Sequence, residues 1–363
     1  MRHSTLVRHL ALTVLSAVVL LAATVALDPF RDYQLATAGA YLCAAAGLTV
    51  LTGLNGQLSL GHGALMAVGA YTVALVQNRF GAATPWTLPV SLSAGVGAAA
   101  AAGAVIGVAA ARLRGPYLAG LTLVVAVAVP AVATVFGGVF HGDQGLPVYL
   151  PPAPAALGPD FPFERWQAWL ALAAALLTLL VLANLVGGRF GRTLRAVRDD
   201  EVAARLAGVS VARTQVLAFV VSAACAGLGG GVFAVLAQSV SPGEFALTLS
   251  LNLLLAVVVG GLGSLAGAVW GSLLLVLLPY LTDALTGGLS LPPALAQRLA
   301  GNLPLSLFGL LLIVVMIAAP GGIQGLLNRA GRWARRRRPR RPAGRVDAST
   351  HEAEPPAPVA SRT

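Results

Sequence analysis

The sequence contains no lysine, so all 24 of its basic residues are arginine. A P-loop nucleotide site needs a lysine after its glycines to reach the phosphates, so the chain cannot hydrolyse ATP through that motif. If the protein takes part in an energy-driven process, another subunit must then supply the energy. Only two cysteines are present, Cys43 and Cys225, and both fall in long apolar runs. Two cysteines placed there behave as small apolar residues and provide neither a disulfide framework nor a metal site.

Charged residues are also scarce, at 10% of the 363 residues, whereas 57% are hydrophobic and the mean hydropathy is +0.81. This composition is typical of a polytopic membrane protein. All 13 acidic residues fall in predicted loops, at span ends or in the tail, which disfavours a carrier driven by protons or ions. The predicted spans contain no Ser-His pair, paired Asp or metal-ligand cluster for an intramembrane enzyme, and we expect no cofactor and no bound metal.

Ten apolar runs predict transmembrane helices, because about 20 apolar residues cross a hydrocarbon core of about 30 Å. We therefore expect an all-α polytopic fold with about ten spans, in a transmembrane domain over residues 1–328. The first run resembles a signal peptide but lacks a clean small-residue cleavage pattern, so we interpret it as a retained helix. The runs are 7–27, 35–52, 64–76, 88–111, 117–136, 166–186, 216–237, 247–259, 265–281 and 305–319.

Arginine is unevenly distributed between the predicted loops. If both termini are cytoplasmic, only Arg31, Arg79, Arg165 and Arg298 lie outside the cell, which is the bias that the positive-inside rule requires. We expect a multi-pass protein of a bacterial-type plasma membrane. The tail, residues 329–363, is basic and then rich in Pro and Ala, which predicts a disordered segment that contacts anionic membrane lipid. Nucleic-acid binding is not expected, since no folded basic domain accompanies the tail.

The densest charge lies in residues 187–215, between the sixth and seventh predicted spans. A single charge at mid-membrane costs roughly 2.5 to 3.5 kcal/mol, so this segment must lie in water. Within it we predict one short helix of about eight residues, which is marginal alone and needs a surface to pack against. The alternative is a basic cytosolic loop that only determines topology. We call residues 187–215 the charged loop.

The ends of this short helix carry the expected signals. Asp199 or Asp200 can cap its N-terminus, where Glu201 also favours the helix dipole. Arg205 lies near the other end, on the same face as Glu201, and the two side chains can pair. Gly208 suits the left-handed position just after the last turn.

Two glycine-rich segments interrupt the apolar pattern. Irregular polar backbone at membrane depth is tolerated only where protein buries it or a cavity hydrates it. The first break, residues 53–63, is therefore either part of a translocation path or a tight cytosolic turn. The second break, residues 257–272, indicates either a weak parallel repeat of the first or glycines that allow close helix packing. The path candidates of the first break are Asn55, Gln57, Ser59, Gly61 and His62.

Several long motifs together resemble one known family, the permeases of branched-chain amino acid ABC transporters, and in particular their M-type subunit. The resemblance extends in order over about residues 35–328. It implies the larger, roughly ten-span type of importer permease. Such a subunit would pair with a second homologous permease, two cytosolic ATP-binding subunits and an extracytoplasmic solute-binding protein. The motifs include LTGLNGQLSLGHGALMAVGAYTVAL, RLRGPYLAGLTL, GRTLRAVRDDEVAARLAGVSVARTQ, SPGEFALTLSLNLLLAVVVGGLGSLAGAVWGS and LFGLLLIVVMIAAPGGIQGLL.

The resemblance also implies a role for the charged loop. Residues Glu201 to Ala204, with Gly208 four residues later, are similar to the EAA coupling segment that docks in a cleft of the ATPase. Val202 stands where that motif has its first alanine, which is a mild departure. The implied coupling residues are Asp200, Glu201, Ala204, Arg205 and Gly208.

Two alternatives remain open for the function. The same machinery could import urea or a short amide, because a path without charges suits neutral and zwitterionic solutes alike. An ATP-independent channel or facilitator would not need a capped cytosolic helix, so co-purification of an ATPase distinguishes it from an importer.

The ten-span arrangement predicts opposite sidedness for two loops. Cysteines introduced at Gly142 and at Ser210 should be labelled from outside and from inside the cell, respectively, by an impermeant thiol reagent. The arginine distribution is the reason for this expectation. Labelling of both positions from the same side would contradict the topology.

Overall fold

The computed structural model describes residues 2–81, 86–113, 115–158, 160–287 and 321–336, and the single positions 309, 310, 313, 314 and 317. The chain divides into two compact units, Met1–Leu326 and Leu327–Thr363. The elements in chain order are α1 (Arg2–Ala26), α2 (Pro29–Leu48), the π-helix η1 (Thr49–Leu54), α3 (His62–Phe80), α4 (Thr87–Ala110), α5 (Pro116–Val135), α6 (Gly137–Phe140), η2 (Gly142–Gln144), β1 (Leu146–Pro147), η3 (Ala155–Leu157), α7 (Phe163–Gly187), α8 (Arg189–Asp199), α9 (Glu201–Leu206), α10 (Val211–Ala237), β2 (Ser239–Val240), η4 (Pro242–Phe245), α11 (Leu247–Gly261), α12 (Leu265–Gly287) and α14 (Gly322–Arg336).

The all-helical membrane fold expected from the composition is confirmed. Seven helices in the described part of the chain are long and apolar enough to cross a membrane, and they coincide with the first, second and fourth to eighth predicted runs. The third run lies in the 19-residue α3, and the ninth lies in α12, whose apolar part is Leu265–Tyr280. The tenth run, 305–319, lies mostly outside the described residues, as does the tail from residue 337.

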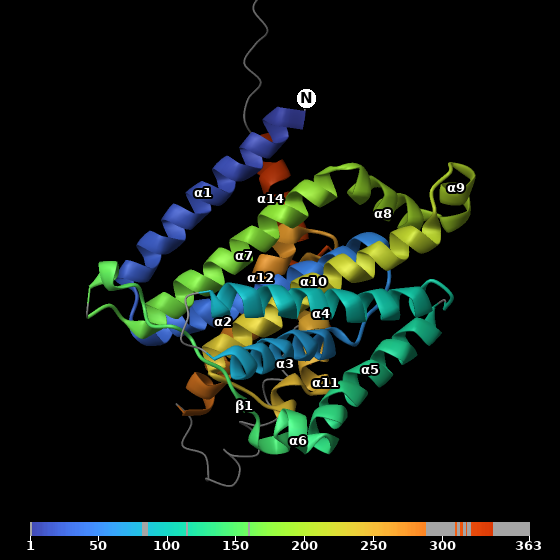
Figure 1. Cartoon of the computed structure of the whole chain (residues 1–363). Coiled ribbons are helices and arrows are strands. Elements are labelled where there is room, and N and C mark those ends of the chain that lie inside the picture. Colours follow the sequence, from blue (N-terminus) through green and yellow to red (C-terminus); the bar gives the residue numbers. More distant parts are fainter. Residues whose placement is uncertain are drawn as a thin grey trace, which may run out of the picture. The chain divides into compact units, whose positions relative to one another are not determined.

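Helix α10 lies at the centre of the first unit, where it packs along α4, α2 and α3 (Figure 1). Glycines make these approaches possible. A Cβ atom at Gly69 of α3 would overlap the backbone of Gly227 in α10, and a Cβ at Gly230 would overlap the backbone of Met66. Lipid tails are as apolar as leucine, so helices in a membrane gain their contacts from such close backbone packing.

One acidic side chain is more deeply placed than the sequence indicated. Helix α2 begins at Pro29, six residues before the predicted run, so Asp32 lies in its first turn and is fully buried. Its Oδ2 atom lies 3.5 Å from Nε of Arg165 in the first turn of α7. An uncompensated charge would be costly there, and the ion pair joins the two helix starts. Both residues precede the predicted runs 35–52 and 166–186, because these helices begin earlier than their apolar runs, at Pro29 and Phe163.

The segment between α5 and α7 folds back onto the helices. Its strand β1 pairs antiparallel with β2, with Leu146 opposite Val240. The amide of Tyr149 donates to Oε1 of Gln77 at 2.8 Å, and the indole of Trp166 donates to the carbonyl of Pro151 at 3.1 Å. This two-stranded ribbon therefore connects α3, α7 and the end of α10 at one end of the bundle.

The close approach of α3 and α10 predicts unequal effects of two similar substitutions. Gly69→Ala places a methyl group against the Gly227 backbone and should lower stability by about 1 to 3 kcal/mol. A Cβ at Gly97 in α4 would have no atom of another segment within 4 Å. Gly97→Ala should therefore be neutral or should stabilise the protein by up to about 1 kcal/mol. Thermal melting of the purified protein in detergent measures both. Equal melting temperatures would contradict this account of the packing.

Candidate functional site

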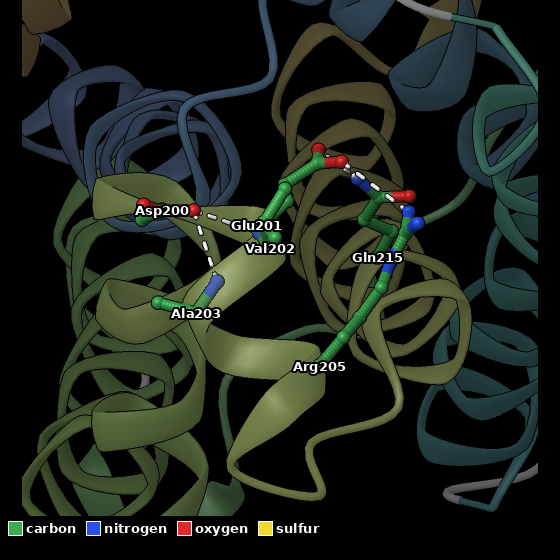
Figure 2. Close-up of polar contacts among 6 residues, drawn as sticks. All are labelled: Asp200, Glu201, Val202, Ala203, Arg205 and Gln215. Carbon is green, nitrogen blue, oxygen red and sulfur yellow. Dashed lines mark hydrogen bonds and ion pairs between the residues drawn. The ribbon is translucent and has the colours of Figure 1, made fainter.

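The short helix predicted in the charged loop is present as α9, although it has six residues and not eight. Asp200 is its N-cap: Oδ1 accepts hydrogen bonds from the amides of Val202 at 2.8 Å and Ala203 at 3.0 Å, as Figure 2 shows. Two amides that have no partner within the helix are thereby satisfied. Of the two candidate caps, the structure selects Asp200.

The charged pair on this helix also forms as predicted. Nη2 of Arg205 lies 3.6 Å from Oε2 of Glu201, and the side-chain amide of Gln215 in α10 donates to Oε1 of Glu201 at 3.1 Å (Figure 2). The pair is partly exposed, so it contributes little to stability by itself. Its structural effect is to hold the first turn of α9 against α10.

The C-terminal end of α9 has the predicted left-handed glycine. Gly208 has a φ of +81°, and its amide donates to the carbonyl of Arg205 at 2.9 Å. The next amide, from Val209, donates to the carbonyl of Ala204 at 2.9 Å. These two bonds are those of a Schellman motif, in which glycine avoids the steric cost of positive φ.

The two faces of α9 differ. Ala204 is buried among Val197, Val209 and Val211 from the neighbouring segments. Val202 and Leu206, four residues apart on another face, are 65% and 86% exposed. A small residue thus packs the helix on its own chain, and two larger apolar side chains remain on the surface of a segment rich in charge.

The sequence analysis missed a second helix in the charged loop. Helix α8 begins after Gly188, and Figure 1 shows it connecting α7 to α9. Its buried residues are Gly191, Leu194 and Val197, at a spacing of three. The sequence shows this three-residue spacing, but the many arginines between these positions make the segment resemble a polar loop. The single residue Asp200 separates α8 from α9, so the two helices are directly joined.

The first break follows a distorted helix end. Helix α2 continues into the π-helix η1, and the chain is then irregular until α3 begins at His62. π-Helical turns are rare in proteins, and those that do occur are often found at functional sites. The polar side chains predicted there are all buried: Asn55 is 4% exposed, Gln57 7%, Ser59 1% and His62 0%.

Hydrogen bonds from three other helices hold the first break. Nε2 of His62 lies 3.0 Å from Oγ of Ser222 in α10, and that hydroxyl donates to the carbonyl of Gly47 at 2.7 Å. The amide of Leu60 donates to Oγ1 of Thr122 in α5 at 3.0 Å. The amide of Gly63 donates to Oγ of Ser250 in α11 at 2.9 Å. Polar backbone that leaves the helix is thus satisfied by side chains of the bundle. A Cβ at Gly61 would lie 2.9 Å from the carbonyl oxygen of Thr122, so α5 passes close to the break.

Residues of the first break and of the α8–α9 segment together line a cavity of about 430 Å³. Asn55 is one of its lining residues, and the two side-chain amide atoms of Asn55 are buried without a hydrogen-bond partner among the described residues. Gln57, Glu201 and Gln215 also line it. Two of the five path candidates, Asn55 and Gln57, therefore line the same cavity as the coupling candidates Asp200 and Glu201, although the sequence separates the two pairs by more than a hundred residues.

The two breaks contact each other. A Cβ at Gly53 would overlap the backbone nitrogen of Gly263 in the second break. Within the second break, a Cβ at Gly260 or at Gly271 would overlap the backbone of the facing helix, at Gly267 and Ala256. The glycines of the second break therefore allow α11 and α12 to pack closely, which is the second of the two interpretations. The internal repeat stays a prediction.

Comparison with known proteins assigns the family. The model of a family described as the branched-chain amino acid transport system permease component matches residues 31–320. The chain belongs to this permease family. Its helices, with the charged loop between α7 and α10, are thus those of a transport permease component.

Individual relatives agree with that assignment. The high-affinity branched-chain amino acid transport system permease protein LivM of Escherichia coli is 34% identical over 259 residues, which are 65% of this chain and 60% of LivM. LivH of the same organism is 30% identical over 116 residues, 32% of this chain and 37% of LivH. The autoinducer 2 import system permease protein LsrC of Klebsiella pneumoniae is 32% identical over 157 residues, 40% of this chain and 44% of LsrC. The match thus spans about three fifths of LivM, and no solved structure matches the chain.

The cap of α9 provides a direct test of its local structure. Asp200→Ala removes both bonds to the first turn and should destabilise α9 by about 1 kcal/mol, or about fivefold in the opening equilibrium. Hydrogen exchange of the Val202 and Ala203 amides should accelerate accordingly. Asp200→Asn should preserve protection because asparagine caps equally well. Asp199→Ala is the control, and equal acceleration in that variant would contradict the assignment of the cap.

Proposed function

We propose that this chain is one membrane-spanning permease subunit of an ABC importer for branched-chain amino acids. Its helices form part of the translocation path, and separate ATP-binding subunits supply the energy. The observation that carries the proposal is α9, a doubly capped six-residue helix that packs through Ala204 and exposes Val202 and Leu206. A helix this short is unstable alone, so its capping at both ends supports a docking role.

The proposed ATPase contact uses the exposed face of α9. Val202 and Leu206 provide apolar anchors, and the partly exposed Glu201–Arg205 pair surrounds them with charge. An apolar centre with a polar rim is the usual organisation of a protein interface. Asp200 and Gly208 act indirectly, because they fix the start and the end of the helix. Ala204 connects the docked helix to α8 and α10.

The proposed translocation path passes the first break. Its polar candidates carry no formal charge, which suits a neutral or zwitterionic solute; they are Asn55, Gln57, Ser59 and His62. The fifth candidate, Gly61, keeps the backbone close to α5. Asn55, whose side-chain amide has no partner among the described residues, lines the cavity beside α8. Leucine, isoleucine or valine is the proposed cargo because of the similarity to LivM. Urea or a short amide is the alternative cargo, and uptake assays with radiolabelled leucine and urea distinguish the two.

The complete transporter in this proposal contains further subunits. A second, homologous permease completes the membrane part, two ATP-binding subunits bind at the charged loop, and a solute-binding protein delivers the cargo outside. Both termini and the charged loop face the cytoplasm, as the arginine distribution requires. An ATP-independent channel is the alternative to this assembly, and it has no use for the capped α9.

Docking through α9 predicts a selective loss of ATPase binding. Leu206→Glu places a charge in the proposed apolar contact and should weaken association with the ATP-binding subunit by about thirtyfold, as for a hot-spot residue worth about 2 kcal/mol. Leu157→Glu in η3 is a matched control, since Leu157 is also exposed but lies in the predicted external segment. Co-purification and titration with the ATP-binding subunit give the affinities. Wild-type affinity of the Leu206→Glu variant would contradict docking through α9.

A further inference from the structure

The end of the second span leaves a backbone carbonyl that needs a donor. In η1, the amide of Asn55 bonds to the carbonyl of Val50, and the amide of Gln57 bonds to that of Leu51. The carbonyl of Gly53 lies beyond these bonds, at the C-terminal end of the helix, where carbonyls lack donors within the helix and carry partial negative charge. Nη1 of Arg198 in α8 donates to this carbonyl at 2.7 Å. The donor comes from a residue 145 positions away in the sequence.

The aliphatic part of Arg198 also lies against the first break. Gly56 has a φ of +75°, and a Cβ placed on it would lie 3.0 Å from Cγ of Arg198. The glycine therefore gives the arginine stem room to cross the break before its guanidinium reaches Gly53. Two contacts, one apolar and one a charge-assisted hydrogen bond, fix the position of this side chain.

Arg198 is rigidly connected to α9. It is the penultimate residue of α8, and the amide of Asp200 donates to the carbonyl of Ala196 at 3.1 Å while its side chain caps α9. Ala204 of α9 packs on Val197, the residue before Arg198. A displacement of α9 is therefore transmitted to Arg198 through backbone hydrogen bonds and a buried contact, over a distance of a few residues.

The first break in turn contacts the rest of the proposed path. Gly53 touches Gly263 of the second break, and His62 at the end of the first break bonds to Ser222 of α10. A force applied at the Gly53 carbonyl therefore acts on both breaks, next to the path candidates. The neighbouring Arg195 differs: its Nη2 donates at 3.3 Å to the carbonyl of Val186, at the end of α7.

From this geometry we infer that Arg198 is the positioning residue that transmits movement of α9 to the first break, through its hydrogen bond to the Gly53 carbonyl. The inference rests on the proposed function, since it takes α9 as the site where an ATPase docks. It adds to that function a defined mechanical connection between the docking helix and the path. Arg198 touches neither the cargo nor the nucleotide in this scheme.

The test separates ATPase docking from coupling. In the reconstituted complex, Arg198→Met keeps the stem but removes the donor, so ATPase binding and basal hydrolysis should stay within about twofold of wild type. Stimulation by loaded binding protein, and the amino acid imported per ATP hydrolysed, should fall at least about tenfold, the equivalent of one charged hydrogen bond. Arg198→Lys keeps a cationic donor and should recover a large part of both. Arg195→Met is the matched control: it also removes one arginine of α8 and its hydrogen bond to a backbone carbonyl, but that carbonyl belongs to Val186 of α7. This variant should behave as wild type.

The outcomes distinguish this inference from the proposed function. Normal coupling in Arg198→Met overturns the inference and leaves the importer assignment intact. Loss of ATPase binding in the same variant also overturns it, because the arginine would then only support the fold of α8. A wild-type chain that neither binds an ATP-binding subunit nor imports amino acids overturns both.

A disulfide between α8 and the first break, in place of the Arg198 contact, tests the same connection independently. A Cβ on Gly56 lies 3.7 Å from Cβ of Arg198, within the range of about 3.5 to 4.5 Å found in disulfides. Cysteine is strained at the φ of +75° of Gly56, so the reduced double variant is the reference that carries this cost without the bridge. In a background with Cys43→Ala and Cys225→Ala, the single Arg198→Cys variant should lose stimulation as Arg198→Met does. Oxidation of the double variant Gly56→Cys/Arg198→Cys should restore it, and reduction should abolish it again. A bridged protein that stays uncoupled would show that joining α8 to the break does not restore coupling, which contradicts the inference.

Discussion

The structure depends on one constraint, that backbone polar groups in an apolar surrounding must find partners within the protein. Continuous helices satisfy it by themselves, and most of the described chain consists of them. The backbone of the first break cannot satisfy its polar groups in this way, so side chains from other helices are their partners. These side chains are Thr122 in α5, Ser250 in α11 and Arg198 in α8. The requirement for donors therefore joins distant parts of the sequence, and it places α8 in contact with the first break.

Close packing through glycine is the second feature on which the arrangement depends. Gly69, Gly227 and Gly230 bring α3 and α10 into backbone contact, and Gly53 and Gly263 bring the two breaks together. Small side chains at these crossings leave little room for independent movement of the helices. The helices that meet at these crossings are therefore held in direct backbone contact.

Helix α9 shows how a short segment acquires a fixed shape without a large core. Its N-terminus has the Asp200 cap, its C-terminus has the Schellman motif at Gly208, and Ala204 holds it on α8 and α10. Each of these interactions is small, on the order of 1 kcal/mol. Together they leave Val202 and Leu206 in a defined position on the surface. In the proposed docking, this fixed shape spares the ATP-binding subunit the cost of ordering the helix.

The sequence by itself determined the membrane class, most helix positions and the local structure of α9, because these follow from long apolar runs, cap residues and a left-handed glycine. It also located the polar residues of the first break. Only the tertiary structure decided that Asp32 pairs with Arg165 and that Arg198 donates to Gly53. The physical reason is that local signals act within a few residues, whereas the donor for a free carbonyl can come from any segment that folding brings near. Such a partner is fixed by packing, and no pattern near Gly53 or Arg198 records it.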